Sequence, residues 1–176
     1  MRHALKLHPD GRCAGVAGID VEVARPRAGV LTLRYVVTGE INALRLPERS
    51  ASARADELWR HTCFEAFVSE GAGYHEFNFA PSTQWAAYSF DSYRAGMRNA
   101  DKFGAPRIDL RIDDDRLALS VELDMPADIT GRLGLTAVIE ETDGNVSYWA
   151  LAHPPGRADF HHADGFAIDL AATDLT

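Results

Sequence analysis

The sequence predicts an all-β protein, an antiparallel, jelly-roll-like β-sandwich of about ten or eleven short strands. Runs in which apolar and polar residues alternate recur along the chain, and turn-forming residues separate them at intervals of about eight to twelve residues. No segment shows the apolar spacing of an amphipathic helix, and the chain contains no internal repeat or linker. Its 176 residues are therefore expected to form a single domain.

The expected strands follow one another in chain order, with a turn signal between most neighbours. Pro9-Asp10-Gly11 separates the first two strands, and the polar segment 48–57 is expected to be a loop. The segment 91–106 has no alternation and is expected to be an irregular excursion. The strands are expected at 3–7, 16–24, 30–38 with a continuation at 39–41 into a short strand that ends at Pro47, 58–69, 74–80, 84–90, 107–112, 116–123, 133–141, 146–151 and 167–170.

Charge and composition exclude several classes of protein. The net charge of −8 and the lack of a basic run argue against a protein that binds nucleic acid through its phosphates. No window is apolar enough to span a bilayer, and no signal-like segment opens the chain, so a cytoplasmic location without a membrane partner is expected. Cys13 falls in a loop and Cys63 in a strand, so two free thiols are expected rather than a disulfide.

The most informative stretch runs from Leu58 to Phe90, where three expected strands each have an apolar face and a mixed face. Side chains alternate between the two faces of a strand, which allows each residue to be assigned to one of them. An ordinary solvated face would carry Lys, Thr and Ser, so a face of Trp, carboxylate and amide indicates a ligand-binding surface. The core is assigned to Phe64, Phe77, Phe79, Tyr88, Leu119 and Val121, and the binding face to Trp59, Glu65, Glu76, Asn78 and Trp85.

The segments LWRHTCFEAFV, YHEFNFAPSTQWAAYSFDSYRAGM, YWAL and DFHHADGF resemble the DOMON-like superfamily, chiefly its bacterial stand-alone domains. That superfamily shares a β-sandwich with family 9 carbohydrate-binding modules and includes exported sugar-binding and haem-binding domains. The resemblance implies that Trp59 stacks on a sugar ring, that Glu65 accepts a bond from a hydroxyl, and that Trp149 closes the other side. The segment 60–63 departs from the family pattern because it lacks the usual acidic residue, which leaves open whether calcium is bound.

The residues therefore predict a non-catalytic module that binds a small molecule or oligosaccharide without a cofactor. Tryptophan supplies flat apolar surface for sugar rings, and carboxylate, amide, imidazole and guanidinium groups bind hydroxyls. The oligomeric state does not follow from the sequence. The candidate ligand-binding residues are Trp59, His61, Glu65, Glu76, Asn78, Trp85, Arg94, Trp149, His153 and His161.

Two other functions are kept as alternatives. Glu65 and Glu76 fall on the same side of neighbouring strands, and a carboxylate pair can hydrolyse glycosides. Haem binding would need an axial pair formed by Met97 with His61 or His153. A metal site from His61, His153, His161 and His162 has no recognisable ligand spacing, and the three aspartates at 113–115 suit a hairpin turn.

A geometric requirement links Trp59 to Glu65. On one extended strand the two residues would be roughly 20 Å apart, because each residue advances about 3.3 Å. A monosaccharide cannot touch both across that distance. Either the ligand is an oligomer, or a bulge or bend near His61 to Cys63 brings Trp59 back over Glu65. We expect the bend, because the chain changes there from a polar loop to a strand.

Overall fold

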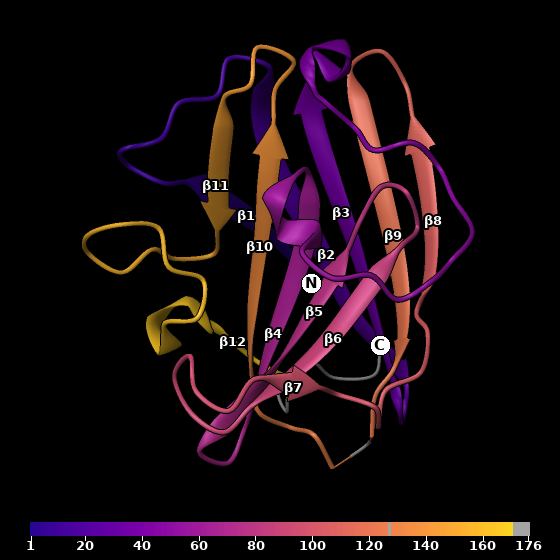
Figure 1. The fold of residues 1–176 in the computed structure, drawn as a ribbon, viewed down its shortest axis with the longest axis vertical. Helices are drawn as coiled ribbons and strands as arrows, with labels where there is room; N and C mark the ends of the chain where they lie inside the picture. The colour runs from indigo at the N-terminus through magenta and orange to yellow at the C-terminus, as the bar shows by residue number, and fades with distance from the viewer. Residues whose placement is uncertain (127, 171–176) are drawn as a thin grey trace.

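A computed structural model describes residues 1–126 and 128–170, and over these residues the chain forms twelve strands (Figure 1). Three short 3-10 helices are the helical elements of this part of the chain: η1 (Ile41–Ala43), η2 (Leu58–Arg60) and η3 (Ala163–Gly165). The strands are β1 (Arg2–Leu7), β2 (Val16–Arg27), β3 (Val30–Gly39), β4 (Cys63–Glu70), β5 (Gly73–Phe79), β6 (Trp85–Phe90), β7 (Arg98–Asn99), β8 (Arg107–Ile112), β9 (Arg116–Asp124), β10 (Arg132–Glu140), β11 (Val146–Ala150) and β12 (Ile168–Asp169).

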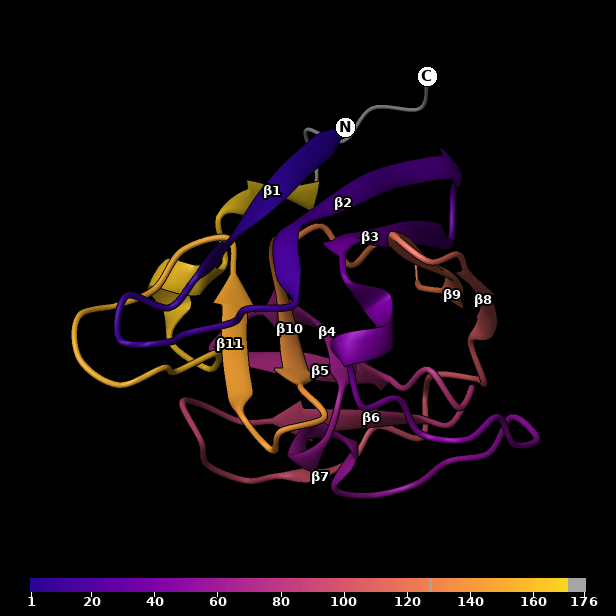
Figure 2. The same cartoon turned by 90° about the horizontal axis from the view of Figure 1, so that it is seen from above.

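The strands form one antiparallel sheet in the order β7-β6-β5-β4-β10-β11-β1-β2-β3-β9-β8, with β12 paired to β10. The sheet curls strongly, so that the half from β7 to β10 faces the half from β2 to β8, as the view from above shows (Figure 2). The predicted all-β, antiparallel architecture is confirmed. Its two layers are the ends of one continuous sheet, because β1 pairs with β11 on one side and with β2 on the other.

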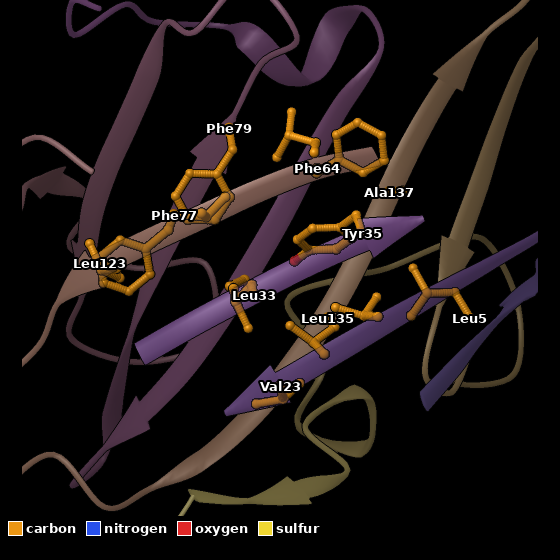
Figure 3. Packing of buried hydrophobic residues seen from close by; sticks show 14 of the residues in the cluster. Leu5, Val23, Leu33, Tyr35, Phe64, Phe77, Phe79, Leu123, Leu135 and Ala137 are labelled. Carbon is orange, nitrogen blue, oxygen red and sulfur yellow. The ribbon is translucent and has the colours of Figure 1, made fainter. Parts of the chain in front are cut away.

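The main core fills the space between the two halves (Figure 3). Phe64, Phe77 and Phe79 reach into it from β4 and β5, and Leu119 and Val121 reach into it from β9. All five are at most 2% exposed, so their assignment to the core is confirmed. Across the core, the hydroxyl of Tyr35 on β3 donates a hydrogen bond of 2.7 Å to the backbone carbonyl of Glu65, which satisfies a polar group in an apolar interior.

The assignment of Tyr88 and Trp85 to faces was wrong by one residue. Residues that lie opposite each other in a sheet share a face, and Trp85 lies opposite Phe79 while Tyr88 lies opposite Glu76. Trp85 therefore belongs to the main core. Tyr88 is buried on the opposite side of the sheet, which we call the outer face. Every residue of β6 is buried, so hydrophobicity could not distinguish its two faces.

Two expected strand segments are 3-10 helices instead. Residues 58–60 form η2, and residues 41–43 form η1, so β4 begins only at Cys63. The aspartates at 113–115 form the β8–β9 turn, where Asp113 and Arg116 exchange backbone hydrogen bonds. Cys13 and Cys63 are free thiols, and no helix in residues 1–126 and 128–170 has the length and apolar character to cross a membrane.

The packing predicts a sharp contrast between two apolar positions. Phe77→Ala should lower the free energy of unfolding by about 3–5 kcal/mol, because it opens a cavity in the main core. Ile112→Ala, at the 50% exposed end of β8, should change it by no more than about 0.5 kcal/mol. Urea unfolding measures both values, and equal losses would contradict the assigned sheet register.

Candidate functional site

A cavity of about 380 Å³ lies on the outer face of β4, β5, β6, β10 and β11, on the opposite side of the sheet from the main core. The 3-10 helix η2 and two loop segments, 94–97 and 158–161, enclose it. Its volume falls within the range of sites for small organic ligands. The lining residues are Trp59, Glu65, Phe67, Glu76, Phe90, Arg94, Met97, Val138, Tyr148, Ala158, Phe160 and His161.

The apolar walls belong to a second hydrophobic cluster, which we call the outer cluster. It consists of Phe67, Tyr74, Ala86, Tyr88, Phe90 and Phe166, with Leu58, Trp59 and Phe160 packed against it. These side chains occupy the face that an antiparallel sheet usually exposes to water. In this protein, that face is covered by η2 and by the segment between β11 and β12 (residues 151–167), which we call the C-terminal loop.

The expected bend before β4 is confirmed, because Trp59 and Glu65 line the same cavity. The chain turns through η2, which follows Glu57 in a left-handed conformation (φ 59°), and becomes extended again at His61. The half-buried ring of Trp59 then packs edge-to-face against Tyr88, with 6.1 Å between the ring centroids. Trp59 is therefore placed by η2 rather than by strand alternation.

Two buried carboxyl groups form the polar floor of the cavity. Glu65 and Glu76 are 2% and 4% exposed, and Glu65 pairs across the sheet with Asn78, two residues from Glu76. The two glutamates are thus diagonal neighbours on one face, a placement that typically separates Cα atoms by about 7–8 Å. Thr136 Oγ1 donates to Glu65 Oε2 and Asn78 Nδ2 donates to Glu76 Oε1, each at 2.9 Å.

Burial raises the pKa of both carboxyl groups, since water no longer stabilises their charged forms. The charge of Glu76 raises the pKa of Glu65 further, whereas the bond from Thr136 opposes that increase. The bond from Asn78 and the charge of Arg94 oppose the increase for Glu76. The floor is therefore a pair of carboxyl groups that retains protons to a higher pH than free glutamates do.

His161 stands beside this pair as a neutral side chain. Burial, with a further contribution from Arg94, lowers the pKa of His161 to about 4. Tyr74 Oη accepts the backbone N–H of Arg94 at 3.1 Å and lies 2.8 Å from His161 Nδ1. Because the hydroxyl can then donate to Nδ1, we assign the proton of the ring to Nε2, which lies 3.8 Å from Glu76 Oε2.

Arg94 contributes a cation to the rim, but an aspartate neutralises it. Its guanidinium lies 2.8 Å from Asp159 Oδ1, and Tyr93 donates a second bond to the same carboxylate. Burial alone would raise the pKa of Asp159, and the bonds from Tyr93 and Arg94 outweigh it and lower that pKa. Arg94 is therefore paired with Asp159 rather than with either of the two glutamates.

Trp59, Glu65, Glu76, Arg94 and His161 are thus the predicted site residues that the structure brings together, and Asn78 supports Glu76 from within the sheet. The other four predicted residues lie elsewhere. Trp85 and Trp149 belong to the main core, His61 is exposed and bonds Glu140 Oε2 at 2.7 Å, and His153 bonds the carbonyl of Lys6 at 2.8 Å.

Trp149 faces inward because it lies opposite Ala137, which in turn lies opposite Phe64 of the core. Its neighbour Tyr148 takes the outer face and lines the cavity. Trp149 and Tyr148 are adjacent in β11, so their side chains point to opposite faces of the sheet. Only the strand pairing shows which of these side chains points outward, so the sequence could not choose between them. Thr136 and Phe160 were also missed, since a strand threonine and a loop phenylalanine carry no distinctive signal.

The expected haem ligands do not meet in this cavity: Met97 lines it, whereas His61 and His153 do not. Among residues 1–126 and 128–170, no group of three or more His, Cys, Asp or Glu side chains is arranged to hold a metal ion.

The carboxyl pair predicts how stability depends on pH. The folded-state pKa of Glu65, raised to about 8, lies above the ordinary value of 4.5. Its contribution to stability is fully present below that ordinary value and is lost as pH rises through the folded value. Glu65→Gln should therefore reduce the fall in Tm between about pH 5 and pH 9, where each 1 kcal/mol corresponds to about 2–4 °C.

Differential scanning calorimetry of the wild type and Glu65→Gln measures this fall. Glu48→Gln is the control, because Glu48 is exposed in the 48–57 loop and should leave the pH dependence unchanged. If Tm fell equally with rising pH in all three proteins, Glu65 would ionise as freely as an exposed residue.

The sequence matches no protein-family model and no curated protein. The structure matches that of a putative carbohydrate-binding protein from Bacteroides uniformis, with a TM-score of 0.62 over 94% of this chain and 84% of that chain. The two sequences are 13% identical over the match, so the similarity concerns the fold alone. The chain thus shares its curled, all-β architecture with that protein.

Proposed function

We propose that this protein is a non-catalytic module that binds a carbohydrate or a similar polyhydroxylated small molecule in the cavity of the outer face. The observation that carries the proposal is the meeting of Trp59 with Glu65 and Glu76 in one cavity of about 380 Å³. Trp59 supplies a ring at the rim, and the two carboxyl groups supply hydrogen-bonding groups at the floor.

This arrangement suits the chemistry of sugar recognition. The C–H face of a sugar packs on a flat aromatic ring, and its hydroxyls need polar partners at fixed positions. Trp59, Tyr148 and Phe160 offer apolar surface at the rim, and Glu65 and Glu76 lie on neighbouring strands of a rigid sheet. Little reorganisation of the floor is needed when a ligand enters, which favours binding.

Two comparisons support the proposal. The carbohydrate-binding role named for the Bacteroides uniformis protein agrees with it, although only the fold is shared. The resemblance to the DOMON-like superfamily agrees as well, because Trp59 and Glu65, to which it assigns the sugar contacts, line one cavity. Tyr148 is the aromatic side chain that could close the other side, in place of Trp149.

Tryptophan fluorescence tests the proposal, because Trp85 and Trp149 lie in the main core and Trp59 lines the cavity. A glycan array should identify a ligand, and that ligand should change the fluorescence of the wild-type protein. Trp59→Ala should abolish the change and weaken binding by about tenfold or more, with a small effect on Tm.

Arg60→Ala is the matched control, since Arg60 is an exposed neighbour on η2 that does not line the cavity. Absence of binding across the array, together with a large loss of stability in Trp59→Ala, would make Trp59 a packing residue and refute the proposal. A Soret band on titration with haemin would instead favour the haem alternative.

Glycoside hydrolysis is the second candidate, and the diagonal pair Glu65 and Glu76 favours it. Such enzymes need one protonated and one ionised carboxyl group, so their two environments push the pKa values apart. Here burial raises the pKa of both groups, which places binding first. Turnover of a chromogenic glycoside by the wild type, lost in both Glu65→Gln and Glu76→Gln, would reverse this order.

A further inference from the structure

The floor of the cavity offers more hydrogen-bond acceptors than donors. Glu65 receives one side-chain bond, from Thr136, and Glu76 receives one, from Asn78, whereas an ionised carboxylate can accept about four. Within the part of the chain that the structure describes, neither carboxyl group is hydrogen-bonded to a Lys or Arg side chain. Donors are therefore missing around both groups in their ionised form, which is the form that an adjacent cation favours.

Asn78 shows the same deficit independently. Its side chain is 0% exposed, and its amide nitrogen is bonded to Glu76, yet its Oδ1 has no hydrogen-bond partner. The residue lies directly opposite Glu65 in the sheet, so this unpaired oxygen belongs to the carboxyl cluster. Buried acceptors without a partner are rare and call for an explanation.

The surrounding charges do not compensate the two carboxyl groups. Arg94 lies at the rim in an ion pair with Asp159, and the neutral His161 places its Nε2 3.8 Å from Glu76. The lowered pKa of His161 means that it does not supply a positive charge near pH 7. The titratable and charged groups that surround the pair are Tyr35, Cys63, Tyr74, Tyr88, Arg94, Asp159 and His161.

Aromatic rings surround the same space. Trp59, Phe67, Phe90, Tyr148 and Phe160 all line the cavity above or beside the two carboxyl groups. The face of an aromatic ring carries partial negative charge and attracts a cation, most strongly when water is excluded. Acidic floor and aromatic walls therefore favour the same kind of ligand group.

We propose that the cavity recognises an ammonium group on its ligand, so that the sugar it binds is an amino sugar with a free amine. This inference rests on the proposed function and makes its ligand class specific. An ammonium offers three N–H donors and one positive charge to Glu65 and Glu76, which both line the cavity. A hydroxyl offers one donor and no charge, so it would leave acceptors unpaired.

Binding of an ammonium should release protons. In the free protein, burial keeps protons on the carboxyl pair near neutral pH, whereas an adjacent cation favours the ionised form. The carboxyl O–H then gives its proton to the buffer, and the ligand remains R–NH₃⁺. Affinity should accordingly rise as the pH is raised from about 5 to about 7.

Isothermal titration calorimetry provides the test, with glucosamine and its β-1,4-linked oligomers compared with glucose, cello-oligomers and the N-acetylated counterparts. Each titration is run in EDTA and in two buffers that differ in ionisation enthalpy. The free-amine ligands should bind at least about tenfold tighter than either matched set, as expected for hydrogen bonds to charged groups. The dependence of the heat on the buffer should show net proton release.

Glu65→Gln and Glu76→Gln should each reduce the preference for the amine and the proton release while retaining the wild-type fold by circular dichroism. Glu140→Gln is the matched control. Glu140 lies on the outer face of β10 and is only 7% exposed, but its carboxyl group bonds His61 and does not line the cavity. It should keep the wild-type preference.

The remaining outcomes separate the two proposals. Equal or tighter binding of the neutral or acetylated sugars would overturn the ammonium inference and leave carbohydrate binding intact. An amine preference that survives in both glutamine variants, or binding that requires a divalent cation, would also overturn the inference. Binding of no sugar in any set, with a silent glycan array, would refute the proposed function itself.

Discussion

Burial of the central strands on both faces is the constraint on which the rest of this structure depends. Strands β10, β4, β5 and β6 place one set of side chains in the main core and the other set beneath η2 and the C-terminal loop. An antiparallel sheet usually leaves one face in water, and its polar residues face outward. Here the second face is covered, so every polar side chain on it needs a partner or a ligand.

Close packing of the C-terminal loop achieves this covering. Phe166 stacks on Phe67 with 5.9 Å between ring centroids, and a Cβ atom at Gly134 would lie only 2.7 Å from the ring of Phe166. Glycine at this position of β10 therefore allows the loop to lie directly on the sheet. The same loop carries Phe160 and His161 to the cavity, so the packing that closes the outer face also completes the site.

The site derives its chemistry from this burial. Glu65 and Glu76 would be ordinary ionised surface residues on an open sheet, and removal from water raises the pKa of both. Thr136, Glu65 and Asn78 form a row across three strands, which fixes the polar groups to the backbone of the sheet. We expect such a floor to reduce the stability of the free protein at high pH, a loss commonly found where residues serve function rather than folding.

A shared fold does not by itself determine what such a cavity binds. The similarity to the Bacteroides uniformis protein covers nearly the whole chain, yet at 13% identity it concerns the fold alone. Function in all-β folds resides in the residues that line a site, and these vary on a constant framework. The acceptor-rich floor and the aromatic walls are the features that make this cavity particular.

Alternation and turn signals are local properties of the chain, and they were enough to predict the fold class, most of the strands and the core positions of Phe64, Phe77 and Phe79. The family resemblance assigned Trp59 and Glu65 to one ligand, and the structure places both side chains at one cavity. The pairing of the strands, which no local pattern gives, placed Tyr148 rather than Trp149 at the cavity and Trp85 in the main core. Every residue of β6 is buried, and Tyr148 and Trp149 of β11 are both aromatic, so hydrophobicity could not assign their faces without the cross-strand register. Phe160 and His161 line the cavity because the C-terminal loop, which is distant in sequence from β4 and β5, packs on the sheet. No local sequence pattern encodes that packing.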